Sequence, residues 1–140
     1  MCKWFRRFFP VKIKRSDRVI KIDKGTNLQL SNDFSSREFD CHCNNCSDTY
    51  IDMKHINNLQ RLRDILGRRI YINSGFRCRS HNIAVGGASK SRHMFGDACD
   101  ISVKGLNPID VHKVAEFFTG LGLYRTFIHI DSRPGKKARW

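Results

Sequence analysis

The sequence predicts a small α+β domain, and three observations favour that class. An amphipathic helix is expected over 49–66 and a second helix over 107–119, while short strands are expected at 70–73, 98–103 and 126–131. The helices and strands do not alternate as repeated βαβ units, so a doubly wound parallel sheet is not expected. With 140 residues, of which 40% are hydrophobic, the chain is long enough for a single domain with a modest core.

The first 29 residues predict a basic extension in front of a main domain at 30–140. Within the extension, the alternating segments 11–14 and 19–22 are joined by a polar turn, which is typical of a β-hairpin. Two interpretations of this hairpin remain open: an accessory packing element, or an element that binds a cell wall or membrane surface.

The helices are predicted from their caps and from the spacing of apolar residues. Ser35 and Glu38 form an S-x-x-E capping pattern, so a short helix should begin near Ser36. Apolar residues then recur at helical steps, and Gly67 is a stop signal. His55 lies on this apolar stripe and is expected to be a core or boundary residue. The stripe consists of Ile51, His55, Ile56, Leu59, Leu62 and Leu66.

The second half of the chain supplies the remaining elements. Asn107 and Pro108 are typical of an N-cap followed by the first helical position, and Gly120 should end that helix. Residues 98–103 have the character of a buried strand in which Cys99 belongs to the core. Residues 79–92 are rich in Gly, Ser and Asn, so we expect a loop that shapes a cleft wall.

Two motifs carry candidate chemistry. Residues 91–100 have the pattern S-x-H-x-x-G-x-A-x-D, which contains His93 and Asp100, and residues 129–131 have the pattern H-x-D, which begins with His129. Gly96 allows a tight turn after His93, so Asp100 on the next strand can point back toward it. Two imidazoles and one carboxylate suit Zn²⁺, and three protein ligands leave a fourth position for water, as in catalytic zinc sites.

These motifs resemble those of the M15 family of zinc peptidases. The family contains D-Ala-D-Ala carboxypeptidases, D-Ala-D-Ala dipeptidases and phage endolysins that cut peptidoglycan peptides. Segments 72–77, 82–88 and 133–140 also match its small members, so the resemblance extends over about 30–140. It implies one catalytic zinc, a peptidoglycan substrate, and a fold of the DD-peptidase and Hedgehog type, in which helices pack on an antiparallel sheet that carries the metal.

The resemblance also implies roles for two further residues. Arg77 ends an S-G-F-R segment whose arginine faces the active site in the family, which assigns Arg77 to substrate binding and oxyanion stabilisation. The alternative is a salt bridge that only holds the loop. Ser91 matches the family serine that binds substrate, and the alternative is a hydroxyl that holds the loop of His93.

One departure from the family concerns the general base. Many members place an acid three residues before the second histidine, where this chain has Thr126; others place a histidine two residues before it, where this chain has Phe127. Asp131 is the best remaining candidate for the base, and its alternative role is to accept the N–H of a ligand imidazole.

Two functional hypotheses therefore remain. The first is a zinc metallopeptidase of peptidoglycan stem peptides or cross-links, acting as a carboxypeptidase or as an endopeptidase of the phage endolysin type. The second is a non-catalytic zinc-holding domain for cell-wall binding or morphogenesis.

Cys41, Cys43 and Cys46 form a C-x-C-x-x-C pattern, and Cys78 is placed to supply a fourth thiolate. A second, structural metal ion is one interpretation of this set. Reduced thiols, or disulfides formed after release from the cell, are the others.

The chain is strongly basic, with a formal net charge of +13. This charge suits anionic cell-wall polymers or a solvated surface, and no recognised motif indicates a specific nucleic-acid partner. No apolar run reaches the ~18 residues of a membrane span, and residues 1–9 lack the apolar core of a signal peptide. We expect a monomer that is made in the cytoplasm and acts on the cell wall, reaching it by holin-type release if it is an endolysin.

Overall fold

The computed structural model describes residues 17–140. Its elements confirm the α+β class, with strands, α-helices and short 3-10 helices (η) mixed along the chain. In chain order they are β1 (Val19–Asp23), η1 (Ser36–Phe39), β2 (Asp48–Asp52), α2 (Met53–Leu66), β3 (Ile70–Ser74), α3 (Arg79–Ala84), η2 (Arg92–Phe95), β4 (Ala98–Val103), α4 (Pro108–Val114), β5 (Gly120–Leu123), β6 (Ile128–Asp131) and β7 (Ala138–Arg139).

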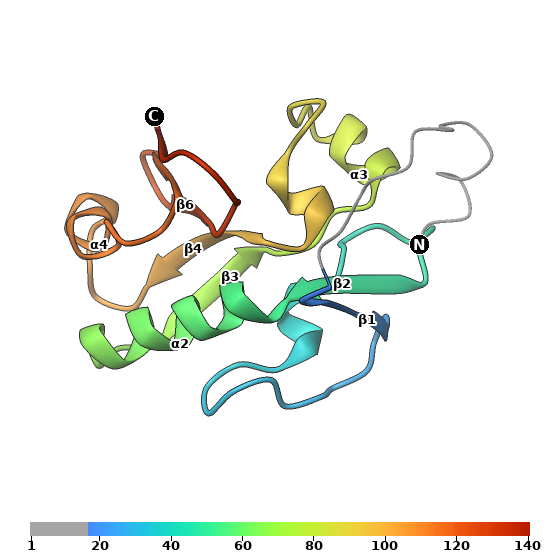
Figure 1. The fold of residues 1–140 in the computed structure, drawn as a ribbon, viewed down its shortest axis with the longest axis horizontal. Helices are drawn as coiled ribbons and strands as arrows, with labels where there is room; N and C mark the ends of the chain where they lie inside the picture. The colour runs from blue at the N-terminus through green and yellow to red at the C-terminus, as the bar shows by residue number, and fades with distance from the viewer. Residues whose placement is uncertain (1–16) are drawn as a thin grey trace.

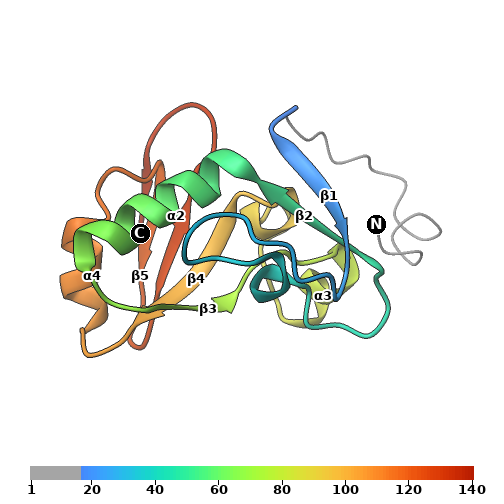
Figure 2. The same ribbon diagram turned by 90° about the horizontal axis from the view of Figure 1, so that it is seen from below.

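A five-stranded sheet organises the fold, with the strand order β3-β4-β6-β5-β7. The pairs β3–β4, β4–β6 and β5–β6 are antiparallel, and only the short edge strand β7 runs parallel to its neighbour β5. In Figure 1, α2 lies below these strands and α3 lies above them. Figure 2, seen from below, shows α2 crossing in front of the sheet, with the β1–β2 pair beyond one end of the helix.

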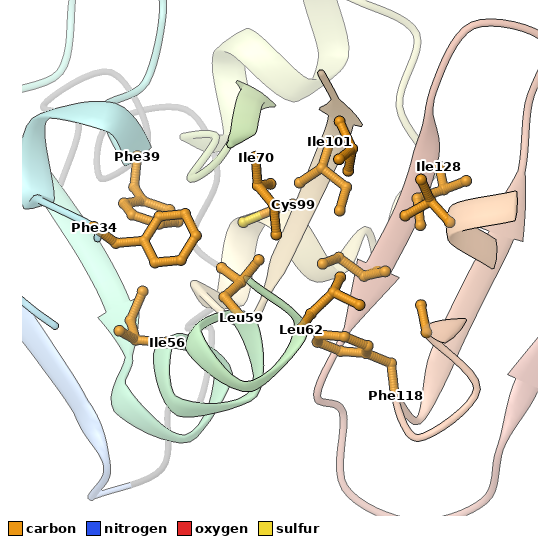
Figure 3. Close-up of a cluster of buried hydrophobic side chains, with 14 of the residues drawn as sticks. Phe34, Phe39, Ile56, Leu59, Leu62, Ile70, Cys99, Ile101, Phe118 and Ile128 are labelled. Atoms are coloured by element: carbon orange, nitrogen blue, oxygen red, sulfur yellow. The ribbon is translucent and has the colours of Figure 1, made fainter. Parts of the chain in front are cut away.

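The core forms where the apolar stripe of α2 meets one face of the sheet. Leu59 and Leu62 of α2 are completely buried, and Figure 3 shows them facing apolar side chains of β3, β4 and β6. Full burial of a leucine contributes about 1.5–3 kcal/mol. His55 and Cys99 are also buried, which confirms their predicted core positions.

Strand alternation divides the sheet into a core face and a face that carries polar groups. Because successive side chains of a strand point to opposite sides, Ile101 of β4 and Ile128 of β6 face the core while Asp100 and His129 face away from α2. The packing of α2 therefore determines which side of the sheet can carry a polar site.

The predicted start of the long helix is wrong by about one turn. Residues 48–52 form strand β2, in which Ile51 pairs with Ile20 of β1, and the helix begins at Met53. Asp52 caps it, since its carboxylate accepts the N–H of Lys54 at 2.9 Å. Thr49, Tyr50 and Ile51 are β-branched or aromatic residues that favour a strand once a partner is present.

Other local expectations have mixed outcomes. The helix at Ser36 is confirmed as η1, and the Ser35 N–H donates to Glu38 Oε2 at 2.7 Å. The loop expected at 79–92 is wrong in its first part, which forms α3, and the second helix ends at Val114 instead of residue 119. Of the predicted hairpin, residues 11–14 lie outside the described residues, and 19–22 belong to β1, which pairs with β2.

Among residues 17–140, no helix combines the length and the apolar character that a membrane crossing requires.

Candidate metal centre

Asp100 and His129 are brought together by strand register. They lie directly opposite each other in the antiparallel pair β4–β6, on the face away from α2. Residues opposite each other in such a pair have Cβ atoms about 4.5–5.5 Å apart. The register thus places a carboxylate and an imidazole within reach of one ion.

His93 reaches the same point from η2, which precedes β4 in the chain. Gly96 ends this turn with a φ of 80°, a left-handed conformation that glycine adopts without strain. A Cβ at this position would also collide with the backbone carbonyl of Tyr50, because the turn packs tightly against β2. Gly96 therefore allows the chain to turn from His93 into the strand that carries Asp100.

The three donor atoms fit a zinc ion. Asp100 Oδ1 lies 3.3 Å from His93 Nε2 and 3.1 Å from His129 Nδ1. Tetrahedral zinc with ligand bonds of about 2.0–2.1 Å holds its donors roughly 3.3 Å apart. The observed separations match that edge length, and all three donors lie within 4.8 Å of one another.

The outer nitrogen of each imidazole is held by a hydrogen bond. His93 donates from Nδ1 to the carbonyl of Gly75 at 2.7 Å, and His129 donates from Nε2 to Asp131 Oδ2 at 2.9 Å. In the neutral rings that a metal ion would bind, these bonds set the tautomers, so that Nε2 of His93 and Nδ1 of His129 can present lone pairs to an ion beside Asp100. Such partners orient metal-binding histidines and raise their basicity.

Asp131 is fully buried, and both of its oxygens accept hydrogen bonds. It is 0% exposed, and Arg133 donates to its two oxygens from Nε at 2.8 Å and from a terminal nitrogen at 2.6 Å. Burial alone would raise the pKa of Asp131, but hydrogen bonds from Arg133 and His129 outweigh it and hold the pKa below the usual range. Gly120 lies opposite on β5, where a Cβ would overlap this carboxylate.

The ligands show the same balance between burial and hydrogen bonding. Without a metal ion, burial would raise the pKa of Asp100, yet its hydrogen bonds with His129 and His93 bring it below the usual range. For His129, burial would lower the pKa, but its bonds to Asp100 and Asp131 raise it. The site therefore favours an ionised carboxylate and attracts positive charge.

Arg77 lies beside the ligand triad. It donates to Asp100 Oδ2 at 3.1 Å, to Ser74 Oγ at 3.1 Å and to Asn82 Oδ1 at 3.4 Å. Its side chain is 16% exposed and lines the pocket described next. Arg77 thus forms a salt bridge with a member of the triad and also places a positive charge at the pocket wall.

A pocket of about 490 Å³ opens over the metal-binding face. Ser91 lines it, as do the aromatic residues Tyr124, Phe127 and Trp140. The Trp140 ring lies 5.1 Å from that of His129, and Tyr124 stacks on Phe127 at 4.5 Å. The complete lining is Arg77, Gly86, Gly87, Ala88, Lys90, Ser91, Arg92, His93, Asp100, Tyr124, Phe127, His129, Arg133 and Trp140.

Sequence reasoning assigned no role to Arg133 or Trp140. The signal for Arg133 was its place two residues after Asp131, which lets the guanidinium fold back on the carboxylate. No local signal pointed to Trp140, which reaches the pocket only because β7 pairs with β5. Thr126, at the position where the family places its acid, is exposed and does not line the pocket.

The four cysteines singled out in the sequence also meet. The sulfur atoms of Cys41, Cys43, Cys46 and Cys78 lie within 4.8 Å of one another, in a second cluster separate from the triad.

Comparison with known proteins agrees with the geometry. The family model described as Peptidase M15 matches residues 32–131, a range that contains the whole triad. A zinc D-Ala-D-Ala carboxypeptidase of Streptomyces albus G is 50% identical over 44 residues, which are 31% of this chain and 17% of that protein. The chain thus matches less than a fifth of the length of this relative. With the family match covering most of its length and the triad assembled inside it, the chain belongs to the M15 family of zinc peptidases.

Proposed function

We propose that the protein is a zinc-dependent peptidase that hydrolyses peptide bonds in peptidoglycan stem peptides or cross-links. The observation that carries the proposal is the convergence of His93, Asp100 and His129 on one point at an open pocket, within the segment that matches the family. The name of the Streptomyces relative supports a D-Ala-D-Ala bond as the substrate class.

His93, Asp100 and His129 would hold the zinc ion. When bound, zinc at such a three-ligand site acts as a Lewis acid toward a carbonyl oxygen and lowers the pKa of water. The protein supplies the fixed geometry: the Gly75 carbonyl holds the His93 ring and the Asp131 carboxylate holds the His129 ring.

Arg77 and Ser91 would bind the substrate. Arg77 is anchored to Asp100, and its guanidinium can meet a substrate carboxylate or the charge that develops on a carbonyl oxygen. Ser91 precedes η2 and lines the same pocket, where its hydroxyl can accept or donate a hydrogen bond.

We assign Asp131 to the positioning of His129. Both of its oxygens accept hydrogen bonds, and its side chain is sealed from solvent. These contacts support the alternative role that the sequence left open for Asp131, and they support it better than the role of general base.

One observation favours a second candidate function. Thr126 stands where many family members have their acid, and Asp100 is the one carboxylate among the described pocket-lining residues. A non-catalytic zinc-holding domain that binds the cell wall would tolerate this substitution. The net charge of +13 suits anionic wall polymers under either proposal.

Purified peptidoglycan distinguishes the two functions. The protein is incubated with it, with and without a chelator, beside the His93→Ala variant, and soluble products are identified by mass spectrometry. Metal-dependent release of free D-Ala indicates a carboxypeptidase, and new amino groups at opened cross-links indicate an endopeptidase. Wall binding without any product, at full zinc occupancy, would refute the peptidase proposal in favour of the binding domain.

An endolysin-type role is a finer form of the same proposal. Expression in a bacterial cell with and without a holin tests it, since lysis only with the holin would show that access to the wall limits the activity.

A further inference from the structure

The cysteine cluster lies apart from the proposed active site and is not used by the proposed hydrolysis. Cys41, Cys43 and Cys46 belong to the segment between η1 and β2, and Cys78 directly precedes α3. The Sγ atom of Cys43 lies 3.5 Å from that of Cys41, 3.2 Å from that of Cys46 and 3.6 Å from that of Cys78. Segments more than thirty residues apart thus converge on one sulfur atom.

These separations fit a metal site better than disulfides. A disulfide requires sulfur atoms about 2.05 Å apart, and the four cysteines are free. Tetrahedral zinc with Zn–S bonds of about 2.3 Å places its sulfur ligands roughly 3.8 Å apart. The cluster needs only a small expansion to reach that size, and Cys43 and Cys46 have the C-x-x-C spacing common in structural zinc sites.

The surroundings of the cluster supply donors to sulfur. The Cys78 N–H donates to Cys41 Sγ at 3.4 Å, Ser80 Oγ lies 3.2 Å from Cys78 Sγ, and Lys24 Nζ lies 3.8 Å from Cys46 Sγ. Four thiolates around a divalent ion leave two net negative charges, which such donors stabilise.

We propose that Cys41, Cys43, Cys46 and Cys78 bind a second zinc ion, which is structural and independent of the catalytic one. Because all four ligands are thiolates, the site has no open position for water or substrate, as in other structural zinc sites. The segments that carry the four ligands also share a small apolar cluster around Phe76.

The cysteine cluster is directly connected to one wall of the pocket. Cys78 follows Arg77 and is the N-cap of α3. Asn82 of α3 accepts a hydrogen bond from Arg77 and donates to the Ala88 carbonyl at 2.9 Å, next to the glycines of the pocket wall. A metal ion at the cluster would therefore fix the turn that carries Arg77 and one wall of the pocket.

Metal counting by mass spectrometry of the full-length protein, purified with reducing agent and zinc, tests the proposal. We expect two zinc ions per chain in the wild type, one in Cys46→Ser and one in His93→Ala. The control Cys99→Ala removes a buried thiol outside the cluster and should retain two. If only the catalytic site failed to bind zinc, the wild type and His93→Ala would each hold one ion and Cys46→Ser would hold none. If only the cysteine site failed, the wild type and Cys46→Ser would each hold one ion and His93→Ala would hold none, so the two failures can be told apart.

Cobalt substitution tests the cysteine site in the wild-type protein, so the result does not require any variant to fold. Cobalt bound to four thiolates gives intense sulfur-to-metal charge-transfer absorption in the near ultraviolet, and His93→Ala should retain it. A single zinc ion in the wild type that Cys46→Ser retains, iron in place of zinc, disulfides in the freshly purified protein, or no charge-transfer band would each overturn the proposal.

Discussion

The role of Asp131 can be tested by replacing it with asparagine. This substitution keeps the shape of the side chain but replaces one acceptor oxygen with an N–H₂ group. In the wild type, one oxygen accepts from Arg133 Nε and the other accepts from both His129 Nε2 and a terminal nitrogen of Arg133. In the variant, an amide nitrogen must face at least one of these donors.

The expected magnitude follows from burial. Asp131 is 0% exposed, so water cannot replace the lost acceptor. A hydrogen bond to a charged group contributes about 1.5–3 kcal/mol, and removal of a partner behind a metal-binding histidine weakens metal affinity about 10- to 100-fold. These two figures agree, because tenfold in affinity corresponds to about 1.4 kcal/mol.

The assay measures zinc affinity and hydrolysis separately. Zinc is titrated against a chromophoric chelator of known affinity, and peptidoglycan hydrolysis is then measured at saturating zinc. We expect the Asp131→Asn variant to bind zinc about 10- to 100-fold more weakly and to recover most of its hydrolytic rate once zinc is saturating. Asp110→Asn makes the same charge change at an exposed residue of α4 and should behave as the wild type.

The opposite pattern would refute this reasoning. If Asp131→Asn binds zinc with unchanged affinity while its rate at saturating zinc falls about 10²- to 10⁴-fold, Asp131 acts as the general base. Its two hydrogen-bonded partners would then serve proton transfer and not the orientation of the ring.

Three further predictions concern stability and packing. Burial lowers the pKa of His55 to about 3 from the usual 6.5, so the unfolded chain binds a proton that the folded chain excludes; in the metal-free protein, His55 by itself should contribute a loss of about 2 kcal/mol between roughly pH 6.5 and pH 5, against the opposite contribution of His129, whose pKa is raised. Urea unfolding should show a smaller loss for His55→Gln, and an equal loss would contradict this. Gly120→Ala should weaken zinc binding because its Cβ would displace the Asp131 carboxylate, and unchanged zinc affinity in that variant would count against the contact. Leu59→Ala, which truncates a side chain with no exposed surface, should lower the free energy of unfolding by about 2–5 kcal/mol, measurable by the same denaturation.

Local pattern predicted the helices well where one face is buried along a whole element. The stripe of Ile56, Leu59 and Leu62 does form the inner face of α2. The helical pattern failed at the start of α2. Ile51, which fits the helical spacing, also suits a strand, and the partner strand β1 is distant in sequence. Asp52 as an N-cap was the one local signal that could have placed the boundary correctly.

For the candidate site, the sequence by itself determined which groups are available: two imidazoles, a carboxylate and four thiols, each tied to a motif with its own spacing. Only the tertiary structure decided how they meet. The β4–β6 register sets Asp100 against His129, and the hydrogen bonds of Gly75 and Asp131 select which ring nitrogens face inward. Side-chain chemistry is a property of each residue, whereas register and ring orientation depend on contacts between segments distant in the chain.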